Sequence, residues 1–315
     1  MYHGIINVYK EAGYTSHDVV AKLRGICGQK KIGHTGTLDP DAVGVLPVCL
    51  GSGTKLCDML TDKQKEYVAG FRLGVVTDTQ DLSGKVLKRK PVESSREEVE
   101  KAVFSFLGES MQVPPMYSAL KVNGKKLYEL ARQGKEVERP ARPVTIYELE
   151  ILSADPPEYQ IRVVCSKGTY IRTLCHDIGQ LLGCGAVMTS LKRTRVGRFC
   201  IEDAYCLSQL RKWKDEGKLW EHICPVDGMF EELPLLMVKK DGWKMLVNGN
   251  PLKMEDLSQT REKEEREREI ADQEEFRVYS HTNTFFGIYR YETKRGLFWP
   301  VKIFPGIEDN HADHT

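Results

Sequence analysis

Runs of apolar residues, separated by glycine-rich or charged stretches, predict alternating short strands and helices. Residues 4–9 are mostly apolar and predict a short strand, and residues 45–50 form an apolar run that is typical of a buried strand. Residues 66–75 alternate as a half-buried strand does. Further strands are expected at 144–152 and 159–166. Helices are predicted where apolar residues recur at helical spacing: 17–27, 95–107 and 170–182.

The pattern changes near residue 230, where prolines and glycines interrupt it, and a domain boundary is expected there. Beyond it a helix is predicted near 240–247, together with short strands at 276–280, 284–292 and 297–304. We therefore expect a small β-rich module over 231–305 and a tail over 306–315. The charged insert 255–275 within the module is either an exposed helix or disordered.

Length and composition exclude several classes of protein. The chain has 315 residues, of which 41% are hydrophobic and 29% charged, as in ordinary globular proteins. No apolar run approaches the ~18 residues of a membrane helix, and the N-terminus lacks the features of a signal peptide. The nine cysteines include no C-x-x-C pair, which argues against a metal site and favours reduced thiols in a cytoplasmic protein.

Charge is distributed unevenly, although the net charge is only +1. Residues 190–198 carry four basic and no acidic residues, and residues 120–143 carry seven basic and three acidic ones. The insert 255–275 is the opposite, with ten acidic and four basic residues. Local patches determine the field that a polyanion meets, so the basic segments are either solvated faces or binding surfaces for nucleic acid.

The glycine-rich segment 33–44 offers the first candidate chemistry. It does not fit an EF-hand, because Val43 and Leu50 stand where calcium ligands would be needed. The nearby residues 51–55 have the wrong order for a phosphate-binding loop. The segment is therefore either a structural loop or the carrier of a catalytic carboxylate, Asp39, flanked by glycines that allow close approach of a substrate.

Two further elements combine aromatic and charged residues. Tyr67 lies near the start of a predicted strand, and Tyr170 and Arg172 lie at a strand-to-helix turn. Such groups suit stacking on a base and pairing with an acid or a phosphate. The alternatives are core packing for the tyrosines and a surface ion pair for Arg172. A long basic loop with a short helix near 126–133 is expected over 113–143.

Three ordered blocks resemble the TruB family of tRNA pseudouridine synthases, the bacterial tRNA pseudouridine-55 synthases. The three blocks are 33–47, 65–81 and 165–173, and the two flanking segments are 13–18 and 114–121. The sequence departs from the family pattern at Asp41 and Val43, where the family has Leu and Thr, and at Glu11, where it has Pro. The resemblance extends from residue 4 to about 230, and more weakly into the C-terminal module.

The resemblance implies an α+β fold: a catalytic domain over 1–230 with a mixed, largely antiparallel sheet flanked by helices, and a PUA-like RNA-binding domain over 231–305. The implied reaction isomerises uridine 55 in the TΨC loop of tRNA to pseudouridine, and it needs no cofactor and no metal. The expected partner is the TΨC stem-loop, and we expect a monomer with no membrane contact.

The resemblance also implies roles for individual residues. Asp39 would be the nucleophile, attacking either C6 of the base or C1′ of the sugar. Tyr67 would stack on the flipped base, and Arg172, beside Tyr170, would pair with Asp39. The remaining candidates are Leu191 as an apolar pocket residue, His34 filling the vacated space in the tRNA loop, and Lys121, Lys125, Lys126, Lys192 and Arg193 contacting phosphates.

Two other functions stay open on the sequence alone. The chain could be a catalytically inactive tRNA-binding or folding factor on the same fold, although the retained set of Asp39, Tyr67, Tyr170 and Arg172 favours an enzyme. It could also be a carboxylate-based nucleoside hydrolase, which would release free base.

Overall fold

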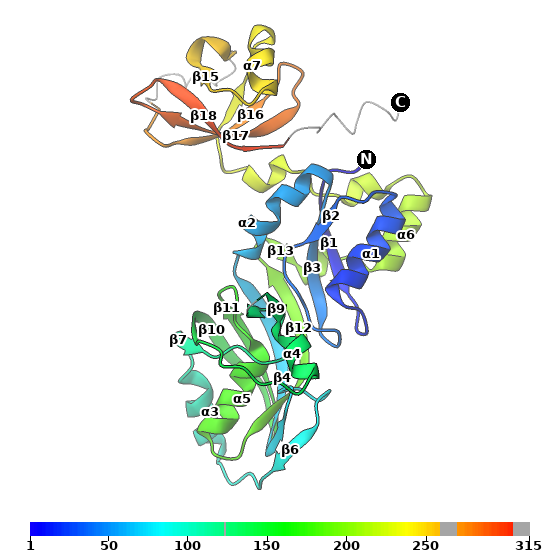
Figure 1. Ribbon diagram of the computed structural model, residues 1–315, viewed down its shortest axis with the longest axis vertical. Coiled ribbons are helices and arrows are strands. Elements are labelled where there is room, and N and C mark those ends of the chain that lie inside the picture. The colour runs from blue at the N-terminus through cyan, green and yellow to red at the C-terminus, as the bar shows by residue number, and fades with distance from the viewer. Residues whose placement is uncertain (123, 259–269, 305–315) are drawn as a thin grey trace.

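The computed structural model describes residues 1–122, 124–258 and 270–304, and within them a nine-stranded sheet forms the larger part of the molecule (Figure 1). The only parallel pairing inside this sheet joins β12 to β3, and the other pairings are antiparallel. The expected α+β fold with a mixed, largely antiparallel sheet is therefore confirmed. In order across the sheet, the strands are β1 (Gly4–Lys10), β3 (Val43–Leu50), β12 (Ala186–Val196), β4 (Lys65–Leu73), β11 (Glu158–Cys165), β10 (Arg142–Asp155) and β7 (Gly108–Gln112), with β2 (Ile32–His34) beside β3 and β13 (Phe199–Cys200) beside β12.

Helices cover the two halves of the sheet separately. Next to β1 and β3, α1 (Ser16–Cys27) packs with α6 (Leu207–Asp215), and next to β10 and β11, α3 (Arg96–Phe104) packs with α5 (Ile171–Leu181) (Figure 1). Capping boxes at Thr15 and Ser95 fix the starts of α1 and α3, because each hydroxyl accepts a bond from the third helical amide. These helices confirm the three predicted from periodicity, whereas α6 was not predicted.

The two halves meet where β12 lies between β3 and β4. Lys192 pairs with Val43 and Arg193 with Gly44 across the short parallel ladder, while Arg193 faces Tyr67 of β4 on its other side. Gly44 is required here, because it has φ +108° and a Cβ would lie 2.2 Å from the Arg193 carbonyl oxygen. This crossing brings the loop before β3 next to β4 and the start of α5.

The basic loop 113–143 contains the expected short helix, α4 (Leu127–Arg132), which follows a small hairpin. The hairpin consists of β8 (Lys121–Val122) and β9 (Lys125–Lys126). The elements that were not predicted include α2 (Cys57–Thr61), β5 (Val75–Thr77) and β6 (Val86–Arg89), together with the strands β2 and β7.

A second, five-stranded sheet is built from the C-terminal residues. Its core aromatic residues join those of the larger part in one cluster, and Tyr279 donates a hydrogen bond to Asp227 at 2.7 Å. Most of the charged insert, residues 259–269, and the tail from residue 305 lie outside the described residues. None of the described helices has the length and apolar character needed to cross a membrane. In order, the strands are β14 (Leu235–Met237), β16 (Glu275–Tyr279), β17 (Phe285–Glu292), β18 (Leu297–Ile303) and β15 (Leu252–Lys253), with α7 (Trp243–Val247) alongside.

Candidate active site

Asp39 lies in the loop between β2 and β3, and hydrogen bonds hold the backbone on both sides of it. The amide of the preceding residue donates to the Ser16 hydroxyl at 2.9 Å. The fully buried ammonium of Lys10 donates to the carbonyl oxygens of Pro40 at 2.9 Å and Ala42 at 2.6 Å. The position of the carboxylate is therefore determined by buried contacts, although the loop has no regular secondary structure.

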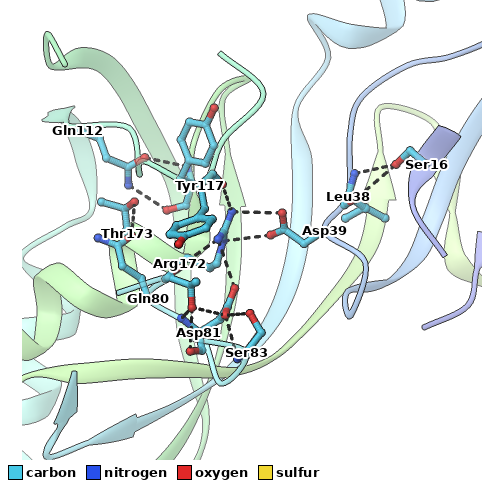
Figure 2. A network of polar contacts seen from close by, with 12 residues as sticks. Ser16, Leu38, Asp39, Gln80, Asp81, Ser83, Gln112, Tyr117, Arg172 and Thr173 are labelled. Carbon is cyan, nitrogen blue, oxygen red and sulfur yellow. Dashed lines mark hydrogen bonds and ion pairs between the residues drawn. The ribbon is translucent and has the colours of Figure 1, made fainter. Parts of the chain in front are cut away.

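Arg172, in the first turn of α5, joins this loop to the other half of the sheet (Figure 2). Its guanidinium contacts both carboxylate oxygens of Asp39, with Nε–Oδ2 at 3.0 Å and Nη2–Oδ1 at 3.2 Å. The same group contacts Asp81 at 3.3 Å and donates to the carbonyl oxygens of Thr79 at 3.2 Å and Tyr117 at 2.9 Å. Because Arg172 is only 5% exposed, these contacts leave it a single orientation.

Opposing influences act on the Asp39 carboxyl. Burial raises its pKa above the ordinary value, Arg172 lowers it, and the nearby Asp81 raises it. The side chain is nevertheless 36% exposed, so one side of it remains open to a ligand. An oriented carboxylate with an open face can add to an electrophilic carbon and later leave it.

The aromatic candidates lie around this carboxylate at different depths. Tyr67 is buried in β4, and burial raises the pKa of its phenol while Arg193 opposes the rise. Tyr170, half-buried just before α5, has its backbone held by the Gln112 side chain, which accepts from the amide at 2.8 Å and donates to the carbonyl at 3.1 Å (Figure 2). Leu191 pairs with a residue of β4 and packs against the core of this half.

His34 ends β2 at the start of the same loop and is half-buried. Burial lowers its pKa, so the ring is neutral at pH 7, and its Nδ1 accepts a hydrogen bond from the Gly36 amide at 3.3 Å. Its ring meets that of His17 edge-on at 5.4 Å. The structure thus places His34 at the edge of the loop that carries Asp39.

Four of the five basic residues predicted to contact phosphates have accessible side chains. Lys121, Lys125 and Lys192 are exposed, and Lys126 is half-buried. Arg193 is the exception, since it is only 1% exposed. Its expected contact with RNA is therefore wrong: β12 turns this side chain into the protein, while its neighbour on the strand faces solvent.

Sequence reasoning gave no role to Lys10 or Asp81. The one sequence signal for Lys10 is its place at the end of an apolar strand, whereas its burial, which makes partners for the charge necessary, is seen only in the fold. Asp81 lay inside a block matched to the family, but only the fold shows that it shares Arg172 with Asp39.

Comparisons with known families and proteins show which family the chain belongs to. The family model described as TruB family pseudouridylate synthase (N terminal domain) matches residues 24–171, and that of the tRNA pseudouridylate synthase B C-terminal domain matches residues 172–231. A tRNA pseudouridine synthase B of Lachnoclostridium phytofermentans is 51% identical over 96% of this chain and 99% of its own. One from Clostridium novyi is 49% identical over 91% and 94%.

Solved structures show the same fold. A chain in an H/ACA RNP bound to a substrate RNA containing 2′-deoxyuridine is 25% identical, with a TM-score of 0.67, over 96% of this chain and 85% of its own. A chain from a Cbf5-Nop10-Gar1 complex is 27% identical, with the same TM-score and coverage. The matched family models and the full-length relatives show that this chain belongs to the TruB family of pseudouridine synthases.

Proposed function

We propose that this enzyme isomerises uridine 55 in the TΨC loop of tRNA to pseudouridine, with Asp39 as the nucleophile. The observation that carries the proposal is the two-point pairing of Asp39 with the buried Arg172, which keeps an open carboxylate ionised and oriented. Relatives of nearly full length bear the name tRNA pseudouridine synthase B, and a structural neighbour holds a substrate RNA.

The proposed reaction needs a group that bonds to the substrate and then leaves. The Asp39 carboxylate adds to C6 of the base or to C1′ of the sugar, and both routes remain open. The N1–C1′ bond breaks, the base turns, and the C5–C1′ bond forms. The bond to Asp39 then breaks, the hydrogen on C5 departs as a proton, and N1 takes up a proton from solvent. The products contain the atoms of the substrate, so no redox partner or group donor enters. Arg172 holds the carboxylate in its ionised form before attack.

The base must leave the tRNA loop to reach Asp39. Flipping costs a few kcal/mol, which stacking and hydrogen bonds in the protein must offset. We assign the stacking to Tyr67, with Tyr170 and Leu191 completing the pocket, and we assign to His34 the space that the base vacates. These side chains are buried or half-buried, so the protein around them already fixes their positions. This supports a pocket that needs little rearrangement when the base enters.

The rest of the chain is proposed to bind the remainder of the tRNA. Residues 1–230 form the catalytic domain, and residues 231–305 form a PUA-like RNA-binding domain. We also propose that the enzyme acts as a monomer in the cytoplasm.

Tritium release from a tRNA transcript containing 5-tritiated uridine tests the function. We expect one tritium released per tRNA and pseudouridine at position 55 in the digested product, with no release from a transcript carrying cytidine at that position. Tight binding without release would support the inactive tRNA-binding factor. Free uracil in the products would support a nucleoside hydrolase.

The hairpin lysines are expected to contact phosphates. Replacing Lys121 and Lys125 together by Ala should weaken tRNA binding and reduce the slope of log Kd against log salt by about 1.4–1.8, because each phosphate contact contributes about 0.7–0.9. Filter binding at several salt concentrations measures the slope. Lys212→Ala, an exposed site on α6, is the control. An unchanged slope in the double variant would contradict the phosphate contacts.

Lys10 is expected to impose an upper pH limit on activity. Its ammonium donates to three carbonyl oxygens, those of Glu11, Pro40 and Ala42, and burial lowers its pKa to about 8. A neutral amine has only two hydrogens for three acceptors, so the single-turnover rate should fall as pH rises above about 8.

The variant Lys10→Met should already be about 10- to 100-fold slower at pH 7, because the loop that positions the carboxylate loosens, and it should lack the Lys10 contribution to the alkaline decline. Single-turnover rates between pH 6.5 and 9.5 test this, with the exposed Lys30→Met as the control. A variant as fast as wild type at pH 7 would show that the contacts of Lys10 do not matter for the reaction.

A further inference from the structure

The buried basic side chains among the described residues gather around one loop. Lys10, Lys65, Arg172 and Arg193 are each less than 10% exposed, and each borders the loop that carries Asp39. Burying a charge is costly unless it is well satisfied, so such a concentration requires a reason. Arg172 binds the Asp39 carboxylate and Lys10 binds the loop backbone, but Arg193 has no role in the proposed reaction so far.

Arg193 joins the two ends of that loop. Its Nε donates to the Val45 carbonyl at 2.7 Å, and its Nη2 donates to the Gly36 carbonyl at 3.3 Å. These two carbonyls lie on opposite sides of Asp39 in the chain, so a single planar group closes the base of the loop. A Cβ at Gly36 would lie 3.7 Å from the guanidinium, at ordinary van der Waals distance, so the loop and the guanidinium are direct neighbours.

The same residue lies beside the proposed stacking tyrosine. Arg193 is the cross-strand partner of Tyr67 in the β12–β4 ladder, and its charge opposes the effect of burial on the pKa of that phenol. Within the described part of the chain, no carboxylate forms an ion pair with Arg193. Its guanidinium donates to the two loop carbonyls and shares a side-chain hydrogen bond with the Tyr67 phenol. The guanidinium therefore touches both the nucleophile's loop and the surface on which the base is proposed to stack.

We propose that Arg193 is a positioning residue that holds the Asp39 loop in a fixed position relative to Tyr67. It acts through these groups and does not touch the substrate, and the inference rests on the proposed roles of Asp39 and Tyr67. A lysine cannot replace it, because Arg193 reaches the two carbonyls with two different nitrogens, Nε and Nη2, whereas a lysine has only one. Loosening the loop should misplace the carboxylate relative to the stacked base, which lowers the rate of reaction more than the affinity for tRNA.

The test compares Arg193→Lys and Arg193→Gln with Arg195→Lys, a control on the same strand whose half-buried side chain contacts Glu66 at 3.5 Å. The first readout is hydrogen exchange of the amides of residues 35–45 in the free protein. The second is a pair of values for each variant, the single-turnover rate and the Kd for tRNA. Glutamine removes the buried charge, so this variant can fold even if the lysine variant does not.

For both Arg193 variants we expect faster exchange confined to this loop, a rate about 100-fold lower, and a Kd close to that of wild type. The control should match wild type in all three. A wild-type rate in a folded Arg193 variant would overturn the proposal, as would a weakened Kd with an unchanged rate, which would indicate a phosphate contact instead. Failure of both variants to fold would also overturn it, because Arg193 would then serve the fold alone.

Failure of the proposed function gives a different result. In that case wild type itself forms no pseudouridine, whereas the exchange measurement still reports whether Arg193 closes the loop. The two hypotheses are therefore judged on separate data.

Discussion

Asp39→Asn is expected to abolish pseudouridine formation while leaving tRNA binding intact. The amide lacks the negative charge that attack on the substrate requires, and it would also leave a bonded substrate slowly. The rate should therefore fall by on the order of 10⁴-fold or more. The fold should survive, because burial disfavours the charged form of this carboxyl in the wild-type protein.

Tritium release and filter binding, measured on the same preparation, test this prediction. Asp41→Asn is the matched control, since Asp41 is an exposed carboxylate two residues further along the same loop. We expect no release from the Asp39 variant, near wild-type release from the control, and similar Kd values for all three proteins. Equal release from wild type and Asp39→Asn would leave the reaction in place and exclude Asp39 as its nucleophile.

Arg172→Lys is expected to lower the single-turnover rate by about 100-fold or more at pH 7, the second largest effect. The ammonium keeps the charge but cannot contact both oxygens of Asp39 and also hold Asp81, so the nucleophile loses its orientation. Arg172 is also the main influence that lowers the pKa of Asp39 against the effect of burial.

The pH dependence provides a second readout for Arg172→Lys. Weakening the pair should raise the pKa of Asp39 further, and because only the ionised form attacks, the variant should lose activity at a higher pH than wild type as the solution is acidified. Single-turnover rates between pH 4.5 and 7.5 measure this shift, with the surface variant Arg162→Lys as the control. A lower rate with an unmoved acid limb would mean that Arg172 orients Asp39 without affecting its ionisation.

Local features of the sequence predicted much of this molecule. The predicted starts of the helices over 17–27 and 95–107 lie within one residue of the observed starts, Ser16 and Arg96, because capping residues such as Thr15 and Ser95 act within a single turn. The strands β1, β3 and β4 followed from apolar runs and alternation. The glycine-rich segment with Asp39 was recognisable because its glycines, and its resemblance to a family, are properties of adjacent residues.

What the sequence could not decide was which side chains face one another. Lys192 and Arg193 are adjacent and carry the same charge, yet one is exposed and the other is 1% exposed, because successive residues of a strand point to opposite faces. Likewise, the sharing of Arg172 between Asp39 and Asp81 depends on strand pairings between segments more than 90 residues apart.

The sequence by itself determined most of the longer helices and strands, the family resemblance and the candidate nucleophile, since capping, periodicity and motif are read from residues close together in the chain. Only the tertiary structure decided that Lys10 and Arg193 join Arg172 in supporting one loop. The physical reason is that the burial of a charge, and the partners that make it tolerable, are set by contacts between distant segments.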